Sequence, residues 1–266
     1  MASFTILEGG RFSLLRFPGF ASGYAHAFVV RGSQPGSLFK PGPFPWDEIG
    51  PAIGLGGAQL HMPRQVHGAS VIERPSPEAG TGEEDPAEAD ALITTRAGHA
   101  IGIATADCLP ILLAGAGGCA AVHAGWRGLL AGVIGEAAQA LRRRSREASA
   151  VPRREEPASV SGPDGGIEAA IGPSIGACCF EVGRDVADRF ADRFARNSVV
   201  EGGSTGGRPR VDLTKAAFLA LEEAGIPPER VHAAALCTRC GGERFESYRR
   251  SGSAAGRMLA VIGRTI

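Results

Sequence analysis

Residues 105–128 read TADCLPILLAGAGGCAAVHAGWRG, two short apolar runs with a cysteine before the first and a histidine at the end of the second. Apolar runs of this length, bounded by Gly and Pro, are typical of buried strands. Pro110 cannot continue a central ladder, and the glycine-rich segment 115–118 permits a tight reversal. The pattern therefore predicts two neighbouring strands that return Cys108 and His123 to the same edge of a sheet.

The flanking residues extend this unit. An apolar, partly β-branched run at 100–106 predicts a preceding strand. Gly125 and Gly128 bracket Trp126 and Arg127 before a helix-like run begins near Leu129, which predicts a functional loop between strand and helix. Residues 131–146 are alanine-rich with a basic end, so we expect a helix whose last-turn arginines complement its dipole.

Further segments alternate between strand-like and helix-like patterns, which predicts an α/β fold. The predicted strands are 12–17, 25–30, 70–72, 91–94, 168–171, 231–236 and 259–262, and the predicted helices are 184–196 and 212–224, the latter with Asp212 as N-cap. Four Pro-, Gly- or Glu-rich segments are expected to be flexible loops, and the second of them to carry no chemistry: about 32–51, 75–90, 148–166 and 197–209.

Composition bounds the function. The 266 residues are 44% hydrophobic and carry 28 basic and 28 acidic side chains, so the chain can bury an ample core and shows no charge footprint for nucleic acid or an anionic membrane. No run of eighteen apolar residues or signal peptide is evident, which predicts a cytoplasmic protein. Six cysteines are too sparse for a disulfide scaffold and are expected to be ligands, nucleophiles or core residues.

Several motifs have open interpretations. Cys108 with His123 could be a nucleophile with its base or part of a metal site. Adjacent Cys178 and Cys179 cannot both chelate one metal easily, so a core thiol is expected for at least one. Cys237-x-x-Cys240 could be half a zinc knuckle or a redox pair, but no second such motif exists, and we interpret Cys237 as a pocket or core residue.

Five motifs in order resemble the YfiH family, also called the laccase-domain family and formerly multicopper polyphenol oxidases. They are Gln65-Val-His67-Gly68, Ala106-Asp-Cys108-Leu-Pro110, His123-Ala-Gly-Trp-Arg-Gly128, Ile171-Gly-Pro173 with Phe180-Glu-Val182, and Ser247-Tyr-Arg-Arg250 with Gly256-Arg-Met258. The resemblance covers roughly residues 24–264.

This resemblance implies a single domain over residues 1–266 with an α/β/β/α-layered sandwich of mixed sheets. It implies zinc held by His67, Cys108 and His123. It also implies phosphorolysis of adenosine, inosine, guanosine and methylthioadenosine, with adenosine deamination as a second activity. The chain departs from the family at Phe180, where Tyr is common, and at Glu246 and Ser251, which leaves the shape of the pocket wall open.

Ligand chemistry agrees with a metal. Two imidazoles and one thiolate leave a fourth tetrahedral position open, as in catalytic zinc sites, and such a zinc could activate water for deamination. The same ligands suit copper, which keeps a copper-dependent polyphenol oxidase as an alternative. Such an enzyme needs more imidazoles than this chain supplies, and four of its six histidines lie outside the three-residue set.

Phosphorolysis also requires an anion site and a proton source. Planar guanidinium groups match phosphate oxygens, so the candidates are Arg31, Arg127, Arg249 and Arg250, with Arg31 and Arg250 preferred. Asp107 could be a general acid or could orient His67 or His123; we favour the orienting role. By resemblance, a hydrolase that edits peptidoglycan precursors is a third possibility. The oligomeric state is not predicted.

Overall fold

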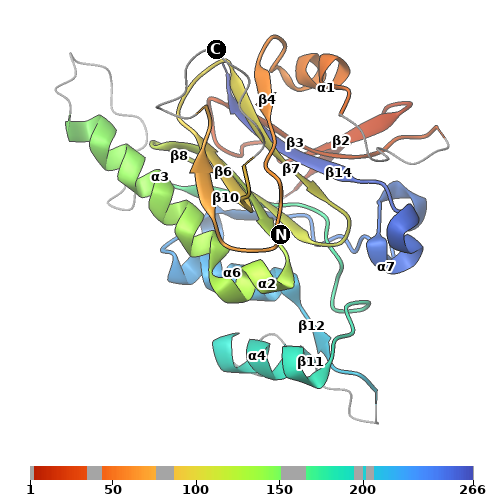
Figure 1. Cartoon of the computed structure of the whole chain (residues 1–266). Coiled ribbons are helices and arrows are strands. Elements are labelled where there is room, and N and C mark those ends of the chain that lie inside the picture. Colours follow the sequence, from red (N-terminus) through yellow and green to blue (C-terminus); the bar gives the residue numbers. More distant parts are fainter. Residues whose placement is uncertain are drawn as a thin grey trace.

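The computed structural model describes residues 3–34, 44–75, 87–150, 166–194, 200–201 and 207–265. In this part of the chain two six-stranded mixed sheets stack face to face, with helices on their outer faces (Figure 1).

The first sheet joins the amino-terminal strands to the last strand of the chain. Its neighbours run antiparallel except for the parallel pair β7 and β4. In spatial order the strands are β1 (Thr5–Leu7), β2 (Phe12–Arg16), β3 (Tyr24–Arg31), β14 (Met258–Arg264), β7 (His99–Thr105) and β4 (Gln59–His61).

The second sheet has the segment 105–128 at its centre. Its outermost pairs on both sides are parallel and the inner ones antiparallel. In spatial order the strands are β13 (Val231–Ala233), β10 (Glu168–Ile171), β8 (Leu109–Gly115), β9 (Gly118–Ala124), β6 (Ala91–Thr94) and β5 (Val71–Glu73). A separate two-stranded ribbon pairs β11 (Val200–Glu201) with β12 (Arg210–Val211).

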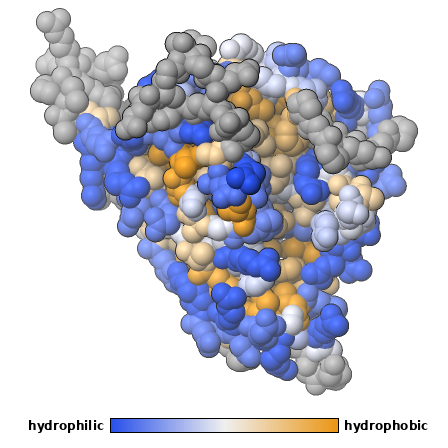
Figure 2. All heavy atoms as spheres, in the orientation of Figure 1, coloured by the Kyte–Doolittle hydropathy of each residue, from blue (hydrophilic) through white to orange (hydrophobic). Residues whose placement is uncertain are grey.

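Helices complete the layers. The α-helices are α1 (Trp46–Ile53), α2 (Trp126–Ala131), α3 (Val133–Ala150), α4 (Arg184–Phe194), α6 (Leu213–Glu223) and α7 (Tyr248–Ser251), and the short 3-10 turns are η1 (Pro228–Arg230), η2 (Gly242–Arg244) and η3 (Gly252–Ala254). The helix α3 runs along the second sheet, and α1 lies on the opposite side of the molecule (Figure 1). Hydrophilic side chains cover most of the border of this face, and hydrophobic ones show toward its middle (Figure 2).

Three apolar layers hold the sheets and helices together. Phe28 and Ile103 of the first sheet pack with Leu112 of the second between the sheets. Because side chains alternate along a strand, Ile111 and Leu113 face the other way, toward α3 and α6. A third layer lies under α1. The predicted α/β/β/α sandwich with mixed sheets is confirmed.

The hairpin predicted from residues 105–128 is also present. In β8 and β9, Leu109 pairs with Ala124 and Pro110 with His123. Pro110 was expected to be excluded from a central ladder, but it lies inside β8. The His123 N–H points away from β8 and donates to Asp90 O at 2.7 Å. Pro110 and His123 therefore face each other as a pair without hydrogen bonds between them, so the missing N–H of proline costs no bond to β9.

Two other expectations need correction. The segment 32–51 was predicted to be irregular, but α1 begins at Trp46, where Asp47 and Glu48 occupy the favoured first-turn positions. The segment 125–128 was predicted to be a loop between strand and helix, but Trp126–Ala131 forms α2, which ends at Gly132 with a φ of 85° before α3 starts. Most of the other three predicted loops lies outside the described residues. No helix in the described ranges is long and apolar enough to span a membrane.

Candidate metal centre

His67, Cys108 and His123 come together from three parts of the second sheet's edge. Cys108 immediately precedes β8, His123 lies near the end of β9, and His67 lies on the loop between β4 and β5. One ligand atom from each residue lies within 4.8 Å of the other two. The sequence therefore identified the three side chains that the fold assembles, and we refer to them as the His67–Cys108–His123 group.

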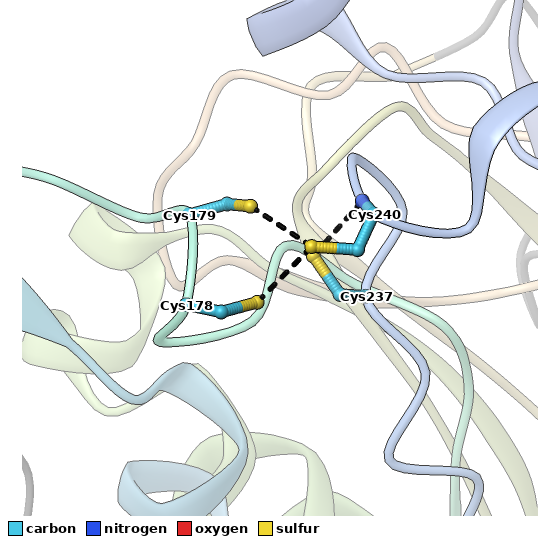
Figure 3. A group of neighbouring side chains, drawn as sticks. All are labelled: Cys178, Cys179, Cys237 and Cys240. Carbon is cyan, nitrogen blue, oxygen red and sulfur yellow. Dashed lines mark hydrogen bonds between the residues drawn. The ribbon is translucent and has the colours of Figure 1, made fainter.

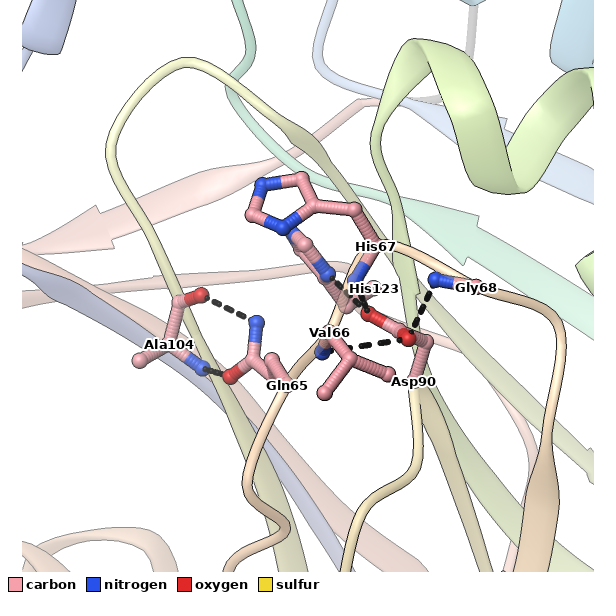
Figure 4. Close-up of polar contacts among 7 residues, drawn as sticks. All are labelled: Gln65, Val66, His67, Gly68, Asp90, Ala104 and His123. Atoms are coloured by element: carbon pink, nitrogen blue, oxygen red, sulfur yellow. Dashed lines mark hydrogen bonds and ion pairs between the residues drawn. The ribbon is translucent and has the colours of Figure 1, made fainter.

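Asp90 holds two members of this group in place (Figure 4). Its Oδ1 accepts hydrogen bonds from His123 Nδ1 at 2.7 Å and from the His67 N–H at 2.9 Å. Its Oδ2 accepts from the backbone N–H groups of Val66 and Gly68 at 3.3 and 2.6 Å. Because His123 Nδ1 is engaged by Asp90, Nε2 is the nitrogen left for a metal.

The prediction that residues 75–90 carry no chemistry is wrong for Asp90, which is fully buried. Its acidic neighbours in sequence suggested solvent exposure, whereas Asp90 directly precedes β6 and the strand carries it into the core. The only available signal was its position next to an apolar run beginning at Ala91.

The pKa values reflect mutual stabilisation in this group. Burial alone would raise the pKa of the Cys108 thiol, but hydrogen bonds with His123 and His67 lower it to about 7. Burial would lower the pKa of His123, but hydrogen bonds to Asp90 and Cys108 raise it to about 9. Burial would also raise the pKa of Asp90, and its hydrogen bonds to His123, Gly68 and His67 hold that pKa below its usual value.

Backbone features bring the ligands close. His67 has a φ of 61°, in the left-handed region. Gln65, two residues earlier, fixes the loop because its side-chain amide donates to Ala104 O at 2.9 Å and accepts from Ala104 N at 2.8 Å. A Cβ added at Gly125 would lie 3.1 Å from His67 Cδ2 and 3.2 Å from Cys108 Sγ, so a glycine is needed beside the ligands.

The His67–Cys108–His123 group opens into a cavity of about 540 Å³, within the range of small-molecule sites. Trp126, Phe180 and Tyr248 supply aromatic walls. Phe180, one of the departures from the family pattern, therefore lies in the wall itself. Among the described lining residues, Asp107 is the one carboxylate.

Asp107 does not orient the histidines. Its Oδ1 accepts from Thr238 Oγ1 at 2.5 Å and its Oδ2 accepts from the Arg249 backbone N–H at 2.6 Å. The orienting role that we favoured for Asp107 is filled by Asp90 instead. Asp107 has a φ of 93°, so the turn before β8 holds it in the left-handed region.

The predicted arginines divide into two pairs. Arg127 and Arg249 line the cavity. Arg127 lies over the Trp126 ring at 4.4 Å, and Arg249 Nη1 donates to the carbonyls of Cys179 and Glu181 at 3.4 and 3.1 Å. Arg257, which is not among the predicted arginines, also lines the cavity.

Arg31 and Arg250 are outside the lining. Arg250 donates to the carbonyls of Thr238, Arg239 and Phe245 and so braces the loop before α7. Arg31 Nε lies 3.8 Å from Glu246 Oε1. Glu246 is buried and its Oε2 accepts from Gly256 N at 2.9 Å, so this second departure from the family pattern supports the loop between η3 and β14.

A second cluster of possible ligands consists of Cys178, Cys179, Cys237 and Cys240, which we call the four-cysteine group. The expectation that Cys178 and Cys179 could not both approach one metal needs correction, because both sulfur atoms lie within 3.4 Å of Cys240 Sγ. Cys237, interpreted as a pocket or core residue, packs against the apolar layer of the second sheet and also belongs to this group, but it is not among the described residues that line the cavity.

The donor atoms of the His67–Cys108–His123 group fit a metal ion. Two imidazoles and a thiolate converge, Asp90 fixes one ring through its other nitrogen, and the open side faces the cavity. Three protein ligands with one accessible position is the arrangement of catalytic zinc.

A family model described as multi-copper polyphenol oxidoreductase laccase matches residues 47–265. The chain belongs to this family. A curated YfiH-family relative, purine nucleoside phosphorylase YlmD of Geobacillus stearothermophilus, is 34% identical over 207 residues, which cover 75% of this chain and 70% of the relative. Adenosine deaminase RL5, from an unknown prokaryotic organism, is 35% identical over 220 residues, which cover 80% of this chain and 78% of the relative.

Solved structures of the YfiH family share the fold. The crystal structure of YlmD from Geobacillus stearothermophilus superimposes with a TM-score of 0.75 at 26% identity, covering 99% of this chain and 100% of that one. Bacillus licheniformis YfiH gives a TM-score of 0.77 at 22% identity, with 98% of both chains covered.

Proposed function

We propose that this protein is a zinc-dependent purine nucleoside phosphorylase that also deaminates adenosine. The observation that carries the proposal is a cavity of about 540 Å³ with the His67–Cys108–His123 group and arginine side chains in its wall. The printed names of two relatives, a purine nucleoside phosphorylase and an adenosine deaminase, support it. Adenosine, inosine, guanosine and methylthioadenosine are the proposed substrates, with phosphate as the second substrate of phosphorolysis.

His67, Cys108 and His123 would hold zinc. Bound there, zinc supplies a Lewis acid and, for deamination, an activated water. The role of Cys108 is then that of a ligand and not a nucleophile. We place the reaction in the cytoplasm, where the six free cysteines would remain reduced.

Phosphate would bind to the arginines of the cavity. Arg127, Arg249 and Arg257 line it, and guanidinium groups in a partly enclosed site match phosphate oxygens with paired donors. We assign a supporting role to Arg31 and Arg250, because they lie outside the described cavity lining, where they contact Glu246 and three backbone carbonyls.

In phosphorolysis an oxygen of hydrogen phosphate bonds to the ribose anomeric carbon and the bond from that carbon to the purine nitrogen breaks. The nitrogen keeps the electron pair and takes up the proton that phosphate loses, so the base leaves neutral. Thr238 and the Arg249 N–H already donate to Asp107, so its carboxylate is suited to accept a further hydrogen bond from the purine or the ribose. We therefore assign Asp107 to substrate binding in the cavity.

The direct test incubates the zinc-loaded protein with inosine, with and without phosphate. Hypoxanthine and ribose 1-phosphate should form only with phosphate, and adenosine should yield inosine without it. Cys108→Ala should abolish both activities, whereas Cys119→Ala, which removes a buried cysteine of β9 outside the cavity, should retain them. Absence of hypoxanthine above a protein-free blank would reject phosphorolysis. Release of an amino acid from muramyl peptides, without phosphate, would instead support the editing hydrolase.

The arginine assignment has its own test. Arg127→Ala should raise KM for phosphate about tenfold or more with an unchanged melting temperature, because one charge-assisted contact is worth about 1.5–3 kcal/mol. Arg250→Ala should lower the melting temperature, because it removes the brace on three carbonyls. A higher KM for phosphate in Arg250→Ala and a lower melting temperature in Arg127→Ala would instead assign phosphate binding to Arg250.

The copper oxidase alternative finds less support in the arrangement of histidines. His61 Nε2 and His99 Nδ1 form their own pair at 3.0 Å, and His26 and His232 pack against Phe20. None of these four histidines lines the described cavity. Elemental analysis that found several copper ions per chain, together with oxygen uptake on a phenol, would favour the oxidase.

A further inference from the structure

The four-cysteine group lies where two loops meet (Figure 3). Cys178 and Cys179 follow β10, and Cys237 and Cys240 follow β13. Because β10 and β13 are parallel neighbours, their carboxyl ends reach the same edge of the sheet. The Thr238 N–H donates to Ser174 O at 2.9 Å and the Ser174 N–H to Leu236 O at 3.2 Å, which fastens the two loops together.

The sulfur atoms are spaced as metal ligands are. All four lie within 4.8 Å of one another, and Cys240 Sγ is 3.4 Å from Cys178 Sγ and 3.2 Å from Cys179 Sγ. Zinc–sulfur bonds of about 2.3 Å place the corners of a tetrahedral site about 3.8 Å apart. A small contraction or expansion of these spacings would therefore accommodate an ion.

The local backbone explains how the adjacent residues Cys178 and Cys179 can both approach one metal ion. The N–H groups of Cys179 and Phe180 both donate to Gly176 O at 2.9 Å, which curls the chain into a tight turn. The turn presents Cys178 and Cys179 to Cys240 from two sides (Figure 3). Two neighbouring residues can thus reach one point without an extended backbone between them.

Two alternatives explain the group less well. Core packing does not account for it, because Cys178 and Cys240 are exposed, in contrast to the fully buried Cys119. A disulfide would join one pair at about 2.05 Å. Here Cys240 Sγ is almost equally distant from Cys178 and Cys179, so the geometry selects neither pair.

Two backbone N–H groups point at the sulfur of Cys237. The Cys237 sulfur accepts hydrogen bonds from the backbone N–H groups of Gly176 at 3.3 Å and Cys240 at 3.5 Å. A Cβ at Gly176 would lie 3.2 Å from Cys237 Cβ and 3.3 Å from Cys178 Sγ, so glycine permits the close approach.

We propose that Cys178, Cys179, Cys237 and Cys240 bind one zinc ion in a closed four-thiolate site, separate from the His67–Cys108–His123 group. Four protein ligands leave no position for substrate, so the role is structural. The site would fasten the loop that carries Phe180 into the cavity wall to the loop whose Thr238 donates to Asp107. Zinc at the four-cysteine group therefore supports the substrate cavity without contacting substrate.

Zinc content of the full chain tests the proposal. After loading with zinc and desalting under reducing conditions, the wild type should contain two zinc ions per chain. The double variant His67→Ala with Cys108→Ala and the single variant Cys240→Ser should each contain one. Cys119→Ala removes a cysteine outside both groups and should keep two. An unchanged zinc content in Cys240→Ser, or no zinc in the double variant, would overturn the proposal.

A measurement on the wild type covers the possibility that Cys240→Ser fails to fold. Chelator-treated and zinc-loaded protein would be alkylated under reducing conditions, and modification would be mapped by mass spectrometry. Zinc should slow alkylation of Cys178 and Cys240, the two exposed members, about tenfold or more. Equal alkylation rates with and without zinc would refute the site, whatever the behaviour of the variant.

Discussion

Asp90 is the residue on which the geometry of the candidate metal centre most depends. This fully buried carboxylate accepts hydrogen bonds from His123 and from the backbone of residues 66–68. One side chain directly before β6 thereby fixes a ring on β9 and the loop after β4. A carboxylate behind a histidine ligand orients the ring and increases its basicity.

Asp90→Asn should therefore weaken zinc binding by about 10- to 100-fold, the usual effect of losing a carboxylate behind a ligand. Competition with a chelator of known affinity measures the change. Glu88→Gln is the matched control, because Glu88 is an exposed carboxylate two residues away, paired with Arg64. Equal zinc affinities for Asp90→Asn and wild type would show that Asp90 does not support the ligands.

His26 is a buried histidine outside the described cavity lining, and its titration should lower stability in acid. Its Nε2 accepts the Phe17 N–H at 3.1 Å, and Nδ1 has no hydrogen-bond partner among the described residues. Burial and then the nearby Arg16 and His232 lower its pKa from 6.5 to about 4. The native state thus favours the neutral ring.

The pKa of His26 is lower in the folded state than in the unfolded state. Its contribution to stability is therefore complete above pH 6.5 and is lost as pH falls toward 4. The loss should be about 3 kcal/mol. His26→Gln keeps an acceptor for Phe17 but cannot be protonated, so its free energy of unfolding should fall less over this range. Urea unfolding at several pH values measures the difference. Parallel curves for the two proteins would contradict it.

At the scale of elements, the junction between β9 and α2 determines how tightly the ligands can gather. Gly125 is the N-cap of α2, with φ of −66° and ψ of 165°, which any residue can adopt. Its restriction is steric, because a Cβ would approach both His67 and Cys108. Gly125 thus connects the strand to the helix directly beside two candidate ligands, where a side chain has no room.

Gly125→Ala should weaken zinc binding about tenfold, because His67 and Cys108 must move apart to accept the methyl group. The control is Gly135→Ala in α3, where an added Cβ would meet no atom within 4 Å. That control should keep the zinc affinity and stabilise the helix by up to about 1 kcal/mol. Titration of both variants by the same chelator competition decides the question. Unchanged affinity in Gly125→Ala would mean that the ligands tolerate displacement.

At the scale of the whole molecule, the contact between the two sheets joins the candidate site to the rest of the fold. Gly172 follows β10 in the second sheet and packs against Phe28 of β3 in the first. A Cβ at Gly172 would lie 2.2 Å from Phe28 Cδ1. Phe28 is buried between the sheets and has little room to move.

Gly172→Ala should destabilise the protein by about 1–3 kcal/mol, the usual cost of overpacking a core. The midpoint of urea unfolding should fall with little change in slope. Gly56→Ala, where the nearest contacts are at ordinary distances of 3.5 Å or more, serves as the control and should leave the midpoint almost unchanged. An unaffected midpoint in Gly172→Ala would show that the sheets can separate locally.

The sequence by itself determined the elements whose information is local. Apolar runs and a glycine reversal predicted the β8–β9 hairpin, and Asp212 predicted the start of α6, where its side chain accepts from the Lys215 N–H. The family motifs also picked out His67, Cys108 and His123. Strand periodicity, turn chemistry and helix caps act over a few residues, so they can be recognised without the fold.

Only the tertiary structure decided which distant residues meet. Asp90 became part of the candidate metal centre because β6 pairs with β9, and the four-cysteine group formed because β10 pairs with β13 across about sixty residues of sequence. The same packing placed Arg257 at the cavity and turned Arg250 toward backbone carbonyls. Pairing between strands far apart in the chain depends on the burial of both sheet faces, a property of the whole chain that no single segment carries.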